Sequence, residues 1–128
     1  MSFEAKLHIE DQEITVLHCR FNFRKSIDAK GQPVESMRGG QISLKIEATN
    51  KIDFISWMKS SNQLKSGKIV FHKRDNMGSM TTVEFSDAHC IDYEKEFNAI
   101  DANPFVTRFV MSVKDISENG SAFENDWS

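Results

Sequence analysis

Apolar and polar residues alternate along most of the chain, which is the pattern of half-buried β-strands. The first strand is expected over residues 3–9, where Phe3, Ala5, Leu7 and Ile9 alternate with polar residues. A tight turn at Asp11-Gln12 then leads into a return strand over residues 13–25. Further strands are expected at residues 41–49, 67–74, 80–85, 87–97 and 105–116, with a hairpin turn over 75–78.

Two of these segments change their buried face partway along. In the return strand, Ile14 and Val16 share one parity, and Leu17 and Cys19 share the other. Between residues 83 and 97 the phase also changes, and the positions fall into two sets: Val83, Phe85, Ile91, Tyr93 and Phe97 against Ala88 and Cys90. A strand that changes its buried face contains a bulge or bends around a barrel corner. The pattern therefore predicts a curved antiparallel sheet.

One helix is expected, over residues 50–60. Asn50 or Asp53 would cap its start. An apolar stripe at helical spacing, formed by Ile52, Ile55, Trp57 and Met58, is expected to plug the core or one end of a barrel. The strand over 105–116 is apolar on both faces, so either the helix or another subunit should cover it.

These elements predict a mainly β fold: a small antiparallel β-barrel, or a sandwich, with one α-helix. One domain is expected over residues 1–116, followed by a polar tail over 117–128 that would be loose unless Phe123 or Trp127 docks. The segment 26–40 holds three of the six glycines and is the longest irregular stretch, which favours a functional loop.

Composition narrows the function. The 128 residues carry 19 acidic and 16 basic side chains, a net charge of −3, which does not favour a nucleic-acid partner. No apolar run of about 18 residues is present, so no membrane insertion is expected. The N-terminus shows no apolar signal-peptide core. We therefore expect synthesis in the cytoplasm and, if the protein leaves the cell, export without a signal peptide.

The sequence contains no recognisable motif for catalysis or cofactor binding. The sequence has no nucleophile elbow, phosphate loop or zinc spacing, and Glu94 and Glu96 share a strand face without a further acid–base partner. We expect no enzyme activity, cofactor or metal. Cys19 and Cys90 each follow a histidine, but neighbouring strand residues point to opposite faces. Buried free thiols are the main interpretation, with a disulfide or redox role as the alternative.

The order of several segments nevertheless resembles one family along essentially the whole chain. These segments are MSFEAKLHI at the start, MRGGQI at 37–42, FISWM at 54–58, GKIVFHKRD at 67–75, FSDAHCIDY at 85–93, NPF at 103–105 and ENDW at 124–127. They are similar to the tube protein of the type VI secretion system, the haemolysin-coregulated protein (Hcp, TssD), in the branch found in Bacteroidota.

The resemblance implies a tail-tube-like β-barrel whose copies form hexameric rings that stack into the inner tube of a contractile injection machine. Its partners would be further copies of itself, the sheath, spike and baseplate proteins, and effector proteins carried in the lumen. The segment 26–40 corresponds to the loop that reaches the adjacent ring in this family. Asp28, Lys30, Glu35 and Arg38 are the candidate ring-to-ring contacts.

Two alternatives are kept. A small β-barrel that binds a ligand would be a stable monomer with a concave aromatic surface. A tail-tube subunit of a related phage-like injector would share both the fold and the ring.

Overall fold

The computed structural model describes residues 3–23, 28–32, 40–73 and 79–124. It contains seven strands and one helix in these ranges: β1 (Phe3–Ile9), β2 (Gln12–Phe21), β3 (Gln41–Glu47), α1 (Phe54–Lys59), β4 (Lys65–Lys73), β5 (Ser79–Phe97), β6 (Phe105–Glu118) and β7 (Ser121–Glu124). The strand order is β3-β2-β1-β4-β5-β6-β7, and β3 also pairs with β6. This pairing closes six antiparallel strands into a barrel, so the predicted fold class is confirmed.

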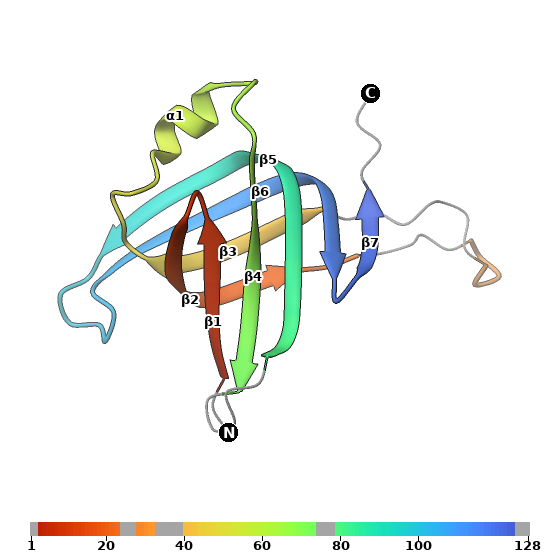
Figure 1. Cartoon of the computed structure of the whole chain (residues 1–128), viewed down its shortest axis with the longest axis horizontal. Coiled ribbons are helices and arrows are strands. Elements are labelled where there is room, and N and C mark those ends of the chain that lie inside the picture. Colours follow the sequence, from red (N-terminus) through yellow and green to blue (C-terminus); the bar gives the residue numbers. More distant parts are fainter. Residues whose placement is uncertain (1–2, 24–27, 33–39, 74–78, 125–128) are drawn as a thin grey trace.

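The two long strands bend around corners of the barrel. Figure 1 shows β5 rising beside β4 and then turning to run along β6. At the corner, Asp87 has a positive φ of 54°, and three steps along β5 oppose two steps along β4. A second register shift follows between Cys90 and Asp92, opposite β6. The predicted change of buried face is therefore produced by two bulges.

In β2 the predicted slip is confirmed. The pairing with β3 shifts between Val16 and His18, which places the bulge at Leu17. The part of β2 before the bulge pairs with β1, and the part after it pairs with β3. Because of this bend, β2 and β5 each belong to both sides of the barrel, and the strands on the two sides cross at a steep angle (Figure 1).

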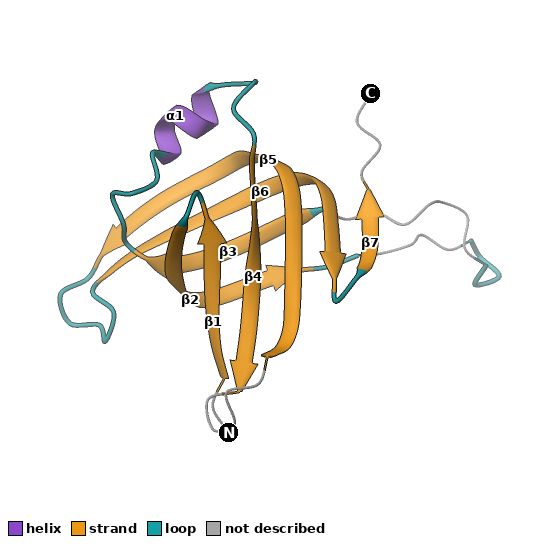
Figure 2. Cartoon of the chain, viewed as in Figure 1, coloured by secondary structure: helices purple, strands orange, loops and turns teal. Residues whose placement is uncertain are grey.

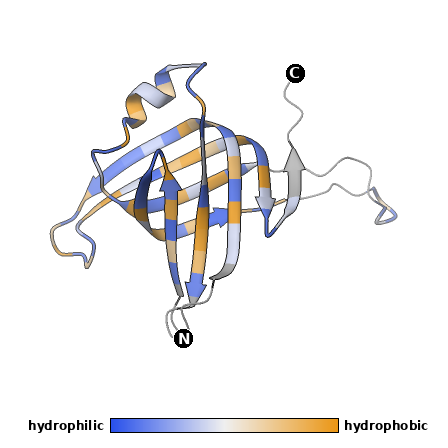
Figure 3. Ribbon diagram, in the orientation of Figure 1, coloured by the Kyte–Doolittle hydropathy of each residue, from blue (hydrophilic) through white to orange (hydrophobic). Residues whose placement is uncertain are grey.

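The core fills the barrel with the residues that alternation placed inward. Ile42, Leu44 and Ile46 of β3 are buried, as are Phe109, Met111 and Val113 of β6. Along these strands apolar and polar positions alternate in Figure 3. The barrel interior is thus occupied by closely packed side chains, as in other small barrels.

The helix is shorter than expected and buries only part of the expected stripe. It spans Phe54–Lys59 rather than 50–60, and Figure 2 shows it at one end of the strands. Asp53 is the N-cap, since its Oδ1 accepts a hydrogen bond from Ser56 N at 3.0 Å. Phe54 and Trp57 are buried, whereas the predicted stripe members Ile55 and Met58 are exposed. Of the four predicted stripe positions, Ile52 and Trp57 are therefore confirmed, and the other two are wrong because a helix of fewer than two turns buries only one or two of its own positions.

Two turns also differ from the expectation. Ile9 pairs with Gln12, so the first hairpin turns at Glu10-Asp11, one residue earlier than predicted, with φ values of 50° and 61°. After Ile116, β6 continues to Glu118, and Asn119 and Gly120 turn the chain back into β7. Both are two-residue turns with positive φ, which match the twist of antiparallel strands.

Some predictions fall on residues outside the described ranges. They are the hairpin turn over 75–78, the end of the return strand at residues 24–25 and the docking of Trp127 in the tail. In the described part of the chain, no helix is long and apolar enough to cross a membrane.

Candidate assembly surfaces

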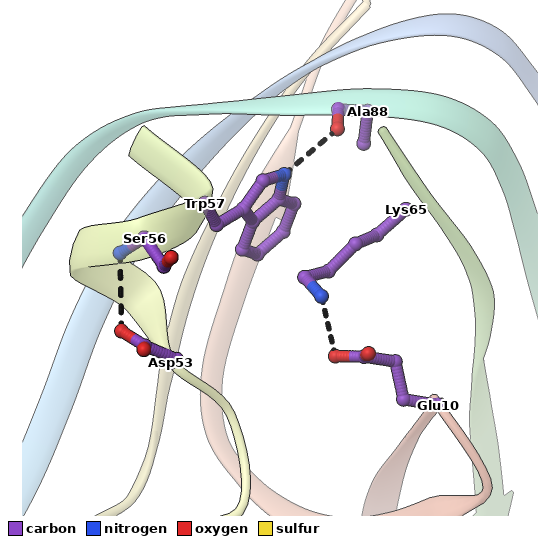
Figure 4. Close-up of polar contacts among 6 residues, drawn as sticks. All are labelled: Glu10, Asp53, Ser56, Trp57, Lys65 and Ala88. Atoms are coloured by element: carbon purple, nitrogen blue, oxygen red, sulfur yellow. Dashed lines mark hydrogen bonds and ion pairs between the residues drawn. The ribbon is translucent and has the colours of Figure 1, made fainter. Parts of the chain in front are cut away.

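The helix closes its end of the barrel through a small set of polar and aromatic contacts, drawn in Figure 4. The indole Nε1 of Trp57, a residue only 1% exposed, donates a hydrogen bond to the Ala88 carbonyl at 3.0 Å. Lys65 Nζ lies 5.5 Å from the centroid of the Trp57 ring and 2.5 Å from Glu10 Oε1. These contacts fix α1 to β5, to β4 and to the first hairpin.

Aromatic rings continue this packing into the barrel. The Phe54 ring lies 4.9 Å from the Tyr93 ring, in a stacked arrangement, and 4.9 Å from the Phe109 ring. Such pairs add about 0.5–1.5 kcal/mol each to the burial of their surface. Since side chains fill the barrel interior, the candidate interaction sites lie on the outer surface of the molecule.

The first of these surfaces is the turn at residues 28–32, within the segment that the sequence singles out. Asp28 Oδ1 accepts hydrogen bonds from Lys30 N at 2.8 Å and Gln32 N at 2.9 Å. Gly31 supports the turn with a φ of 83°. Asp28 and Lys30 are both exposed, as a contact role requires. Glu35 and Arg38, the other two candidates, lie outside the described residues.

The second surface is the β5–β6 turn, whose three exposed apolar residues we call the apolar tip: Phe97, Ile100 and Phe105. Their exposures are 65%, 91% and 48%. The Phe97 and Phe105 rings meet edge to face at 5.8 Å. Asn98 N donates to the Pro104 carbonyl at 2.6 Å, which closes the turn. The tip is therefore an ordered apolar projection, a feature that commonly marks a protein interaction site. The alternating pattern of the sequence gives this turn no role.

A groove borders the apolar tip, and we call it the end groove. It encloses about 590 Å³ between the starts of β2 and β6 and the ends of β3 and β5. Its charged lining residues are Glu13, Glu47, Lys51 and Lys95, and Phe105 belongs to both the groove and the tip. Four elements that are distant in sequence form this groove, so no local sequence motif predicts it.

A larger hollow of about 850 Å³ crosses the outer face of β2, β3, β6 and β5. Within it, Arg108 Nη1 lies 2.6 Å from Glu96 Oε1 and 3.4 Å from Glu94 Oε1. The hydrogen bond from Arg108 lowers the pKa of Glu96. The prediction that the two glutamates share a strand face is confirmed. Their partner is the Arg108 cation and not an acid–base group.

The cysteines are free thiols, as the main interpretation held, with Cys90 buried and Cys19 half-buried. Burial raises the pKa of both thiols to about 11. Such thiols are poor nucleophiles at neutral pH. Among the described residues, no group of three or more histidine, cysteine or acidic side chains is arranged to hold a metal ion.

A closed barrel with a packed interior, a helix at one end and a loop joining β2 to β3 is the architecture of tail-tube-like proteins. The family model for hemolysin coregulated protein Hcp (TssD) matches residues 1–128. The chain therefore belongs to the haemolysin-coregulated protein family and is a structural tube subunit of the type VI secretion system.

Solved structures agree with this assignment. Hcp1 from Flavobacterium johnsoniae, a member of the Bacteroidota, is 28% identical with a TM-score of 0.87, over 95% of this chain and 99% of that one. Hcp1 from Salmonella typhimurium is 14% identical with a TM-score of 0.71, over 96% and 92%. A chain of the anti-feeding prophage baseplate shares the fold at 11% identity and a TM-score of 0.54, over 93% of each chain. A search of curated protein sequences gave no match.

Proposed function

We propose that six copies of this chain form a ring and that the rings stack head to tail into the inner tube of the secretion machine. The observation that carries this proposal is the family match over the whole chain, together with the close likeness to the Flavobacterium protein. The chain acts as a structural subunit rather than as an enzyme. It is made in the cytoplasm and leaves the cell through the machine itself.

The partners follow from this role. Sheath, spike and baseplate proteins would contact the tube, and effector proteins would travel in its lumen. Structures with a similar fold support the first group, since one is part of the anti-feeding prophage baseplate and another of the sheath–tube complex of an extracellular contractile injection system.

Contacts between rings are assigned to the 26–40 loop through Asp28, Lys30, Glu35 and Arg38. The exposure of Asp28 and Lys30 and the ordered turn that presents them support this assignment. Each exposed ion pair contributes only about 0–1 kcal/mol. Because six loops act at every ring junction, the weak contacts add up while single contacts still break easily. This suits a tube that assembles and later comes apart.

Light scattering combined with negative-stain electron microscopy tests the ring. Six chains of 14.7 kDa give an assembly of about 88 kDa. Six-fold rings with a central hole, stacking at high concentration, are the expected result. A monomer at every concentration, also when mixed with sheath and baseplate proteins, would contradict the proposal and favour a ligand-binding barrel.

The loop is tested by deleting Gly31 to Glu35. The deletion should leave the rings intact and abolish their stacking, because the barrel does not depend on this segment. Normal tubes from the deleted protein would show that ring-to-ring contacts lie elsewhere.

A further inference from the structure

The apolar tip and the 28–32 turn lie at opposite ends of the molecule. In Figure 1 the turn projects at one extreme of the long axis, and the β5–β6 connection forms the other. Head-to-tail stacking is a heterologous contact, in which one surface of a subunit meets a different surface of the next. A loop that projects from one end of the barrel would meet such a different surface at the opposite end, which carries the apolar tip and the end groove.

We propose that the end groove and the apolar tip together receive the 28–32 turn of a subunit in the adjacent ring. This proposal rests on the stacked tube proposed above and identifies the receiving surface that the tube requires. The occupant is a second copy of this chain, and the contact repeats once for every subunit at each ring junction.

Charge supports this pairing. The turn presents one acidic and one basic side chain, Asp28 and Lys30. The end groove presents two acidic residues, Glu13 and Glu47, and two basic residues, Lys51 and Lys95. Each charge of the turn therefore has residues of opposite charge available in the groove.

The apolar tip provides the hydrophobic part of the proposed contact. Its side chains include Ile100, which at 91% exposure makes almost no contact within its own chain. Burial of a large apolar side chain contributes far more than an exposed ion pair. Lys95 Nζ lies 5.6 Å from the centroid of the Phe105 ring, so the charged groove and the apolar tip form one continuous surface.

Both surfaces are also preorganised. The turn is held by the two hydrogen bonds to Asp28 Oδ1, and the tip by the Asn98–Pro104 backbone hydrogen bond and the Phe97–Phe105 ring contact. Preorganised surfaces lose little conformational entropy on binding, so a small contact area is enough to hold the two surfaces together.

Disulfide trapping tests the contact directly. The double variant Lys30→Cys/Asn50→Cys places one thiol on the turn and one in the end groove. Oxidised rings of this variant should give a ladder of covalently linked chains on a non-reducing gel. The yield should exceed that of the control pair Lys30→Cys/Ile55→Cys at least tenfold, because Ile55 is an exposed helix residue that does not line the end groove.

Two features make the trapping decisive. The ladder should grow with ring concentration, since links between rings depend on encounters and links within a ring do not. The native thiols of Cys19 and Cys90 interfere little, because burial raises their pKa to about 11. The single variants Lys30→Cys and Asn50→Cys measure any background. Intact rings without a ladder above the control would overturn the proposal.

A substitution in the tip provides the second test. Ile100→Asp should leave six-fold rings unchanged in the microscope but reduce tube length at least tenfold, whereas the matched variant Ile55→Asp should form normal tubes. Tubes of normal length from Ile100→Asp would exclude the tip. If the unmodified protein forms no rings, the proposed function itself fails. That result differs from intact rings that stack by another surface.

Discussion

Replacement of Trp57 by Phe tests whether α1 closes the barrel through specific contacts. The variant loses the hydrogen bond from the indole to the Ala88 carbonyl, and Ala88 is fully buried. A buried acceptor left without a partner costs about 1–3 kcal/mol. The smaller ring leaves a cavity that costs about 1 kcal/mol more. We therefore expect a loss of about 2–4 kcal/mol in the free energy of unfolding.

Urea unfolding followed by far-UV circular dichroism measures this loss, because the variant removes a fluorophore and would distort a fluorescence comparison. Both proteins must be compared at one concentration and in the same ring state, since assembly adds to the apparent stability. Ile55→Ala is the matched control on the exposed face of the same helix, and it should change stability by no more than about 0.5 kcal/mol. A Trp57→Phe loss as small as that of the control would refute the reasoning.

Burial raises the pKa of Cys19 and Cys90 from 9.0 to about 11, so the folded protein keeps protons that the unfolded chain releases. Stability should fall between pH 9 and 11, and thermal unfolding of the double alanine variant should lack this part of the decline. Gly120→Ala should strain the β6–β7 turn, where φ is 95°, by about 1–2 kcal/mol and speed amide exchange in β7. Arg108→Gln should raise the pKa of Glu96 towards its usual value in an NMR titration.

Alternation made the strands predictable because each has one face on the core. The positions that alternation assigned inward in β3 and β6 are buried, from Ile42 to Val113. The pairing of β3 with β6, which closes the barrel, joins segments about 65 residues apart and leaves no local sign. The sequence therefore left barrel and sandwich as alternatives, and only the family resemblance favoured the barrel.

Bulges were only partly predictable. The change in the phase of apolar positions correctly predicted that β5 bends. It also placed Ile91 among the inward residues, and this was wrong because Ile91 is 46% exposed. The reason is that two bulges lie close together, at Asp87 and at Ile91, so the inward parity changes twice over a short part of the strand. Aspartate tolerates the left-handed backbone that the first bulge needs, which gives a weak signal that pattern reading passes over.

One turn signal was present and not used. Asn119-Gly120 is the strongest short-range indication of a hairpin, yet the polar composition around it favoured a tail. The candidate contact residues Asp28 and Lys30 came from the family resemblance, which assigns their irregular segment to the contact between rings, and their role stays a prediction. The end groove was not identified, because its lining comes from β2, β3, β5 and β6 and becomes a surface only after closure.

Closure of the barrel also constrains how copies of the chain can associate. A closed sheet leaves few unpaired backbone groups through which another sheet could add, and the hairpin extension ends in β7, a strand of four residues. The larger surfaces open to partners are then the two ends of the barrel and its side-chain faces. The bulges at Leu17 and Asp87 bend β2 and β5 so that the long β2–β3 loop leaves at one end and the β5–β6 turn at the other. A substitution that straightens either strand would therefore misalign the two ends and should impair stacking even where the barrel still folds.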